Sequence, residues 1–294
     1  QRQMCIRDRH VAHVNRVIDP DCTPQPSPPD QPPKSQNDPP DLSSISINPD
    51  RKEEYIPWES KFSELHKKFA HVFSNHLPGY NGHAGPVTAT VNMSNSLPPQ
   101  RKGRCPQYCR DKLVDLQNVI DDLEFVGVFR RPEDVNVNVE YVNPSFLIKK
   151  KNGYRLVTSF GEVAKHSKPS PSLMPDVDST LRQIGQWKYI IKTDLTKSYF
   201  QIPLSHSSQK YCGIVTPFRG IRVYQRCAMG MPGSESALEE LMSRILGDLI
   251  VAGNVAKIAD DLYCGANSLH DLISIWTKVL QLLSDCDIRL SAPK

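Results

Sequence analysis

Three aspartates in two short apolar segments are the residues of this sequence best suited to chemistry. Asp194 closes the strand-like segment 188–194, and Asp260 and Asp261 lie between apolar neighbours. Such surroundings disfavour the charged form of a carboxylate, and a divalent cation removes that penalty. Mg²⁺ prefers hard oxygen ligands, and two such ions about 3.5–4 Å apart can hold the attacking and leaving oxygens of an in-line displacement. The pattern therefore predicts a magnesium site, with a solvated Asp-Asp turn as the alternative.

A basic hairpin at 146–157 is a second group suited to phosphate chemistry. Three lysines at 149–151 and Arg155 surround the pair Asn152-Gly153, which is a strong hairpin signal. Ammonium and guanidinium groups can clamp a polyphosphate, and arginine supplies bidentate geometry. Taken alone, these residues are equally consistent with a charged, soluble hairpin tip.

The elements that would position these residues alternate between helices and short strands. Helices are expected where apolar residues recur at helical spacing, and strands where short apolar runs are bounded by turn residues. The expected helices cover 60–73, 108–126, 234–252 and 268–285, and the expected strands cover 141–150, 154–160, 188–194 and 255–264. This alternation indicates an α+β or α/β core. The apolar stripe of 268–285, which includes Trp276, is assigned to that core.

Composition narrows the class of protein. A formal net charge of +4 over 294 residues excludes a polybasic binder. Ten of the 25 prolines lie between positions 20 and 49, so residues 1–56 are predicted to be a disordered Pro-rich linker, with folded structure from residue 57. No apolar run reaches the roughly 18–20 residues that span a bilayer. Eight scattered cysteines indicate reduced thiols in an intracellular protein.

Two other groups of residues are weaker candidates. Cys105 and Cys109 lack a second ligand pair at zinc-finger spacing and are interpreted as ordinary thiols. Four histidines are too widely spaced to share one face of a helix and are interpreted as surface or hydrogen-bonded residues: His66, His71, His76 and His83.

Four segments, in this order along the chain, closely resemble the reverse transcriptases of retroviral-type Pol polyproteins, most nearly those of gypsy-like LTR retrotransposons. They read FLIKKKNGYRLVTSF, IKTDLTKSYFQIPL, CAMGMPGS and KIADDLYCG. The resemblance runs from about residue 58 to residue 294. It implies an α+β fold with the fingers and palm of a right-hand polymerase over residues 57–294. In that fold an antiparallel palm sheet is backed by helices, and this chain would end before the thumb.

The resemblance assigns catalytic roles by position. Asp194 resembles the first catalytic aspartate of the palm, and Asp260 and Asp261 resemble its paired aspartates. Asp194 and Asp260 would hold two Mg²⁺ ions, for which Mn²⁺ is a substitute, and Asp261 would have a lesser role as a ligand. The sequence departs from the family at Ile258, where a tyrosine is usual. Lys294 matches a lysine proposed to protonate the leaving pyrophosphate, but it is the terminal residue.

Five further residues match substrate-binding positions of the family. Tyr199 matches the aromatic gate that excludes a ribose 2′-hydroxyl, although a core aromatic is the alternative. Lys150 and Arg155 match fingers residues that grip the incoming triphosphate. Met229 and Gly230 match the segment lining the nucleotide and template site, where glycine permits close backbone approach.

The resemblance implies an RNA-directed DNA polymerase that adds deoxynucleoside triphosphates to a primer on an RNA or DNA template. Its polyprotein partners would be protease, RNase H and integrase regions, in an element that transposes by DNA integration. No membrane is involved, and the expected location is intracellular, in a cytoplasmic virus-like particle or in the nucleus. One alternative is a truncated nucleic-acid-binding remnant with weak or no catalysis. Another is an RNA-directed RNA polymerase, against which Tyr199 argues.

Overall fold

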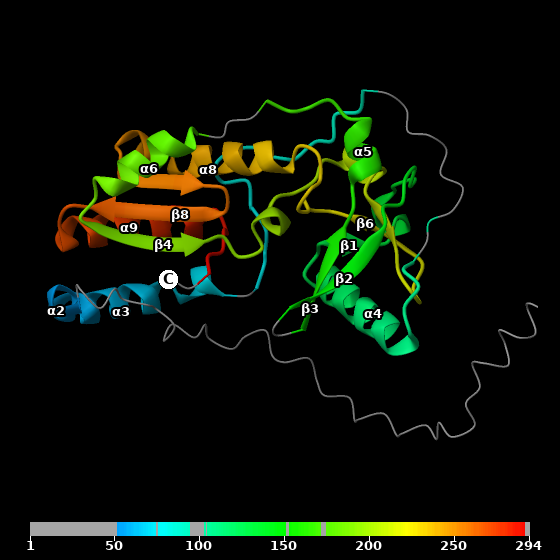
Figure 1. Cartoon of the computed structure of the whole chain (residues 1–294), viewed down its shortest axis with the longest axis horizontal. Helices are drawn as coiled ribbons and strands as arrows, with labels where there is room; N and C mark the ends of the chain where they lie inside the picture. Colours follow the sequence, from blue (N-terminus) through cyan, green and yellow to red (C-terminus); the bar gives the residue numbers. More distant parts are fainter. Residues whose placement is uncertain are drawn as a thin grey trace, which may run out of the picture. The chain divides into compact units, whose positions relative to one another are not determined.

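A computed structural model describes residues 52–74, 76–94, 103, 105–150, 153–171 and 175–291 (Figure 1). Residues 1–51, which make up most of the predicted disordered linker, lie outside the described residues. The described residues belong to one unit of the chain, Asn37–Lys294. No helix in this described part is long and apolar enough to cross a bilayer.

A three-stranded antiparallel sheet carries the three aspartates. Its order is β4 (Tyr189–Asp194), β8 (Asp261–Ala266) and β7 (Val255–Ile258). β4 and β8 pair from Tyr189 opposite Ala266 to Asp194 opposite Asp261. Because β7 and β8 are joined by only two residues, the chain reverses tightly at this end of the sheet. The predicted strand 188–194 and the predicted strand pair 255–264 are therefore confirmed, with β8 continuing two residues further.

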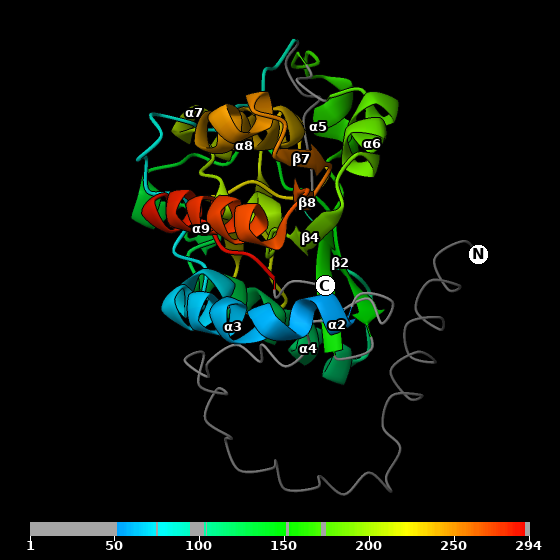
Figure 2. The same ribbon diagram turned by 90° about the vertical axis from the view of Figure 1, so that its left-hand side faces the viewer.

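Helices cover one face of this sheet. α8 (Ser234–Val251) contacts β7 and α9 (Leu269–Asp285) contacts β8 and β4 on that face, whereas α6 (Val177–Gly185) contacts β7 from the other side (Figure 2). α9 begins after Ser268, whose side chain accepts a hydrogen bond from the backbone N–H of Asp271 at 3.1 Å. Its predicted apolar stripe is buried, with Trp276 fully enclosed. The sheet is thus backed by amphipathic helices, as the sequence analysis expects.

A second group of elements surrounds α4 (Arg110–Phe125). This helix contacts β1 (Phe129–Arg130) and β3 (Gly153–Thr158). β1 lies in a sheet of order β1-β6-β5 with β6 (Ile221–Tyr224) and β5 (Gly213–Val215). β3 pairs with β2 (Ser145–Lys150) as the predicted basic hairpin, whose turn residues 151 and 152 lie outside the described residues.

β2 begins at Ser145, four residues later than the predicted strand. Pro144 lacks a backbone N–H, and the preceding residues bond elsewhere. Tyr141 and Asn143 donate backbone hydrogen bonds to Lys210 and Gly213, at 3.2 and 2.7 Å. The apolar run 141–150 is therefore divided between two partners, which its pattern does not reveal.

The first described helices differ from the expected single helix. α3 (Glu59–Lys68) is followed by a separate 3-10 turn, η4 (Ala70–Phe73), in which the carbonyl of Val72 accepts a hydrogen bond from the N–H of Leu290 at 2.8 Å. α2 (Lys52–Tyr55) and η3 (Ile56–Trp58) precede α3. In the described part of the chain, residues 52–56 are helical, although they fall within the segment 1–56 that is predicted to be a linker.

The remaining short elements connect these layers. They are η5 (Glu133–Val135), α5 (Gly161–Lys165), η6 (Ser198–Gln201) and α7 (His206–Gln209). Of these, η6 matters most for the site, because it follows β4 directly and carries Tyr199.

Candidate active site

The sheet register brings the three aspartates to one end of the same sheet. Asp194 is the last residue of β4 and lies directly opposite Asp261, the first residue of β8. Directly opposed residues of an antiparallel pair have Cα atoms roughly 4.5–5.5 Å apart. Asp260 precedes Asp261 in the turn from β7. Residues that are distant in sequence therefore meet, although their catalytic role stays a prediction.

Asp194 is held by the segment that follows α9. The hydroxyl of Ser291 donates to Oδ2 of Asp194 at 3.0 Å, and the backbone N–H of Ser291 donates to the carbonyl of Asp194 at 2.8 Å. The hydroxyl of Thr193 in turn donates to the carbonyl of Ser291 at 2.7 Å. The end of β4 and its aspartate are thus positioned by residues almost one hundred positions later in the chain.

Asp260 lies in a strained turn. Its predecessor Ala259 has φ of 52°, a left-handed conformation that costs roughly 1–2 kcal/mol for a residue with a Cβ. Two bonds support Asp260 there. The hydroxyl of Ser198 donates to its Oδ1 at 3.1 Å, and the backbone N–H of Leu195 donates to its carbonyl at 3.3 Å. The turn is therefore fixed against the residues that follow β4.

Asp261 has a cationic partner. The ammonium of Lys192 lies 2.9 Å from its Oδ2, and the hydroxyl of Tyr263 donates to the same oxygen at 3.4 Å. The hydrogen bond to Asp261, followed by that to Tyr263, raises the pKa of Lys192 above its ordinary value. Lys192 therefore stays charged and places its ammonium beside the carboxylate of Asp261.

The three aspartates do not form a compact metal cage with other described residues. Within the described residues, no three side chains among His, Cys, Asp and Glu are grouped closely enough to hold a metal ion. The donor set nevertheless fits Mg²⁺, which needs only one or two carboxylates and takes its remaining ligands from water and phosphate. Asp194 and Asp260 would supply these carboxylates, and each accepts a hydrogen bond from a serine hydroxyl at one oxygen.

Tyr199 lies beside the aspartates on η6. It is half-buried and packs against the core, as expected if Tyr199 is a core aromatic residue. Burial, and then the nearby charge of Asp260, raise the pKa of Tyr199 to about 12, so its hydroxyl stays protonated. A neutral ring next to Asp260 is consistent with a gate and with a core aromatic alike.

Two side chains that sequence reasoning missed hold η6 in place. The amide of Gln201 donates to the carbonyls of Thr196 and Arg289 at 2.7 and 2.9 Å, and its oxygen accepts from the N–H of Arg289 at 2.6 Å. The guanidinium of Arg226 donates to the carbonyl of Phe200 at 3.2 Å. No sequence signal marks either residue, because both act through backbone atoms.

The other predicted substrate residues form a second cluster. Arg155 lies on β3, and its Nη2 is 3.1 Å from Sδ of the exposed Met229. Lys150 is exposed at the end of β2, opposite Gly153. Gly230 has φ of 80°, and a Cβ there would meet nothing within 4 Å. Backbone conformation, not contact with the rest of the chain, therefore requires glycine at position 230.

A buried ion pair lies behind the catalytic turn. Lys257 of β7 and Glu239 of α8 are in direct contact, with their side chains 5% and 7% exposed. Lys257 is opposite Leu262, so it points to the helix-covered face of the sheet, away from Asp261. This pair joins α8 to the strand that enters the turn.

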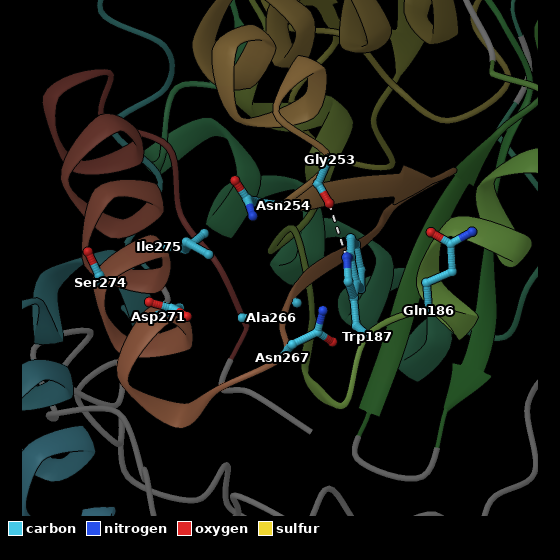
Figure 3. Close-up of a pocket in the computed structure, with 10 residues that line it drawn as sticks. Gln186, Trp187, Gly253, Asn254, Ala266, Asn267, Asp271, Ser274 and Ile275 are labelled. Carbon is cyan, nitrogen blue, oxygen red and sulfur yellow. Dashed lines mark hydrogen bonds between the residues drawn. The ribbon is translucent and has the colours of Figure 1, made fainter.

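A pocket of about 500 Å³ lies at the other end of the same sheet (Figure 3). The indole N–H of Trp187 donates to the carbonyl of Gly253 at 3.0 Å, and its ring covers Gly265. Amide side chains of Asn254 and Asn267 contribute to the lining. The lining comes from the end where β4 begins and β8 stops, so this pocket is separate from the aspartates.

The weaker candidates behave as ordinary residues. His66 is buried and its Nε2 accepts a hydrogen bond from the indole N–H of Trp276 at 2.9 Å; burial lowers its pKa to about 4. The cysteines in the described part of the chain, Cys105 and Cys109 among them, are free thiols.

Comparisons with known proteins agree with this geometry. The family "Reverse transcriptase (RNA-dependent DNA polymerase)" matches residues 148–294, half of the chain. The retrovirus-related Pol polyprotein from transposon 297 of Drosophila melanogaster is 22% identical over 187 residues, which cover 62% of this chain and 17% of that protein. That from transposon opus, also of Drosophila melanogaster, is 24% identical over 260 residues, 86% of this chain and 25% of that protein. The chain thus spans a quarter or less of these relatives.

Solved structures show the same fold. The foamy viral protease-reverse transcriptase in complex with an RNA/DNA hybrid superposes with a TM-score of 0.67 at 19% identity, over 85% of this chain and 32% of that chain. Its complex with dsDNA gives 0.66 at 18% identity, over 85% and 49%. The α+β fingers-and-palm fold expected from the sequence is therefore confirmed. With the family match over half its length and this fold, the chain belongs to the reverse transcriptase family.

Proposed function

We propose that this chain is the RNA-directed DNA polymerase domain of a gypsy-like retroelement Pol polyprotein. One observation carries the proposal: the register of β4 and β8 places Asp194 opposite Asp261 and next to Asp260. Acids in this arrangement suit nucleotidyl transfer, which needs charge stabilisation and positioning more than covalent catalysis. The chain spans a quarter or less of its curated relatives, so the activity is proposed for it by analogy with those longer proteins.

In this proposal Asp194 and Asp260 hold two Mg²⁺ ions, for which Mn²⁺ is a substitute. When bound, the metal stabilises charge on the attacking primer oxygen and on the departing pyrophosphate. Arg155 and Lys150 bind the triphosphate, and arginine offers the bidentate geometry that phosphate favours. Tyr199 excludes the ribose 2′-hydroxyl. Asp261, already paired with Lys192, contributes less as a ligand.

The proposed substrates are deoxynucleoside triphosphates and a primer on an RNA or DNA template. The foamy viral protease-reverse transcriptase is in complex with an RNA/DNA hybrid in one similar structure and with dsDNA in another. A duplex would be held by contacts to its phosphate backbone, which make binding dependent on salt. The proposed partners are the protease, RNase H and integrase regions of the polyprotein, within a cytoplasmic virus-like particle or in the nucleus.

Primer extension tests this function. The purified chain, alone and within its polyprotein, is supplied with an RNA template, a DNA primer, deoxynucleotides and Mg²⁺. Extension should fall at least about 10³-fold in Asp194→Asn, because the variant loses a metal-holding charge but keeps the shape of the side chain. Extension that survives this substitution would disprove the proposal.

The same assay separates the two alternatives. A nucleic-acid-binding remnant would bind the primer–template in a salt-dependent manner in both contexts and extend nothing. An RNA-directed RNA polymerase would incorporate ribonucleotides as well as deoxynucleotides. If Tyr199 is a gate, Tyr199→Ala should raise ribonucleotide incorporation relative to deoxynucleotide incorporation by roughly 10- to 100-fold.

A further inference from the structure

One face of the palm sheet carries two acids and one cation in a compact group. Asp194 lies opposite Asp261, and Lys192 lies opposite Tyr263. Directly opposed residues, and residues two apart on one strand, share a face of an antiparallel sheet. Lys192, Asp194, Asp261 and Tyr263 are therefore neighbours on the face that α8 and α9 leave uncovered. We call these four residues the charged quartet.

Within the charged quartet the cation is committed to one acid. The ammonium of Lys192 lies 2.9 Å from Oδ2 of Asp261 and 5.4 Å from the centre of the Tyr263 ring. Asp194 accepts a hydrogen bond from the hydroxyl of Ser291, and Asp260 accepts one from the hydroxyl of Ser198. Lys192 thus pairs with Asp261, a choice that the residue types do not reveal.

We propose that Lys192 is an intramolecular counter-ion of Asp261 that a divalent cation must displace, so that Lys192 sets the metal affinity of the site. The inference rests on the proposed function, because it takes the aspartates to be the metal site. A hydroxyl can keep its bond to one carboxylate oxygen while the other oxygen binds a cation. An ammonium cannot remain close without repelling that cation, so Asp261 becomes a ligand only when Lys192 moves away.

The exposure of the Lys192–Asp261 ion pair indicates how strongly Lys192 should weaken metal binding. The side chains of Lys192 and Asp261 are 41% and 34% exposed, so solvent weakens their attraction and allows exchange. An exposed positive charge beside a divalent cation should weaken metal binding by about three- to tenfold. Lys192 would thus limit the time that metal stays bound without nucleotide, whereas the phosphates of a bound nucleotide add negative charge and offset the repulsion.

Metal binding can be measured directly, without catalysis. Free Mn²⁺ is titrated against the chain and followed by electron paramagnetic resonance, with Mg²⁺ as competitor. Lys192→Met should bind Mn²⁺ about three- to tenfold more tightly than the original chain, and Lys192→Arg should bind it as the original chain does. Lys188→Met is the matched control, because it removes the same charge at the far end of β4, where Lys188 pairs with Glu54 at 3.6 Å.

The outcomes separate this inference from the proposed function. Unchanged or weaker Mn²⁺ binding by Lys192→Met, or equally tighter binding by Lys188→Met, would overturn the counter-ion role. If Asp194→Asn binds Mn²⁺ as well as the original chain does, the proposed metal site itself is wrong. Lys192→Gln provides the same comparison should the Met variant fail to fold, and circular dichroism checks folding of each protein.

Discussion

The two ends of the palm sheet differ in what their strands present to solvent. At one end, where β4 finishes and β8 begins, Asp194 lies opposite Asp261, each half-buried and each bonded to side chains of other elements. At the other end Trp187 covers Gly265, and a pocket lined largely by amides and small residues lies alongside. The same register thus builds a charged end and a packed end.

The difference shows how one end of a sheet can carry the residues proposed for catalysis while the other end contributes to stability. Charges gathered at the end of a sheet repel one another and need partners, so this end contributes chemistry at some cost in stability. The packed end depends on close contact between the ring of Trp187 and Gly265, although charged residues lie there too, with Asp271 at the pocket and Lys188 paired with Glu54. Substitutions at the first end should therefore change activity, and those at the second should change the free energy of unfolding.

The largest expected effect tests the charged end. Asp260→Asn should lower primer extension at least about 10³-fold, whereas Asp261→Asn should lower it clearly less, because Lys192 is already paired with Asp261. Both variants should unfold at the original temperature or slightly above it, since each removes one of three neighbouring negative charges. Single-turnover extension and thermal unfolding provide the two measurements, and equal losses of activity would contradict the distinction.

A second prediction concerns the ion pair behind the turn. Lys257→Met leaves Glu239 buried without its cation, which should lower the free energy of unfolding by about 3–5 kcal/mol. The double variant Lys257→Met with Glu239→Leu should recover most of this loss, because no unpaired charge remains. Urea unfolding of the single and double variants measures both changes. A single variant as stable as the original chain would show that the pair is dispensable.

Gly265→Ala tests the packed end. A Cβ at this position would lie 2.0 Å from the ring of Trp187, so the ring must move. Such overpacking should lower the free energy of unfolding by about 1–3 kcal/mol, measured by urea unfolding. Activity per folded molecule should stay the same at a temperature where the variant is folded. A large loss of activity in the folded variant would mean that the two ends are coupled.

The smallest effect is expected in the pocket of the packed end. Asn254→Ala should change the free energy of unfolding by no more than about 0.5 kcal/mol and leave primer extension unchanged, because the residue is half-exposed and at a distance from the aspartates. Thermal unfolding and extension assays would show this together. A marked loss of primer extension would mean that the pocket contributes to catalysis, so the two ends of the sheet would not differ in function.

Long amphipathic helices and the aspartate strands could be predicted from the sequence. The apolar stripe of α9 and its Ser268 cap are local signals, so the predicted and observed bounds differ by one residue at the start. β1, β5 and β6 were not predicted. They are two to four residues long, and β1 pairs with β6 through Phe129 opposite Tyr224. Strands this short take their stability from distant partners, and no local pattern marks them.

The residues of the candidate site likewise divide into those that the sequence identifies and those that only the structure shows. The sequence identified the aspartates by type and surroundings, but not Ser198, Ser291 or Arg226, which act from other elements. Lys192 could have been found, because a residue two positions before Asp194 on a strand must share its face. Close backbone approach of a nucleotide at Gly230 stays a prediction, and its positive φ is a separate reason for glycine that only the structure shows.

The sequence by itself determined which residues carry charge, where the amphipathic elements lie and to which family the motifs point, because these properties depend on neighbours along the chain. Only the tertiary structure decided which partner each acid has. That choice depends on strand register and on the return of the chain after α9, which juxtapose Ser291 with Asp194 and Lys192 with Asp261. Contacts between distant segments are selected by the packing of the whole domain, and packing is not encoded in any single segment.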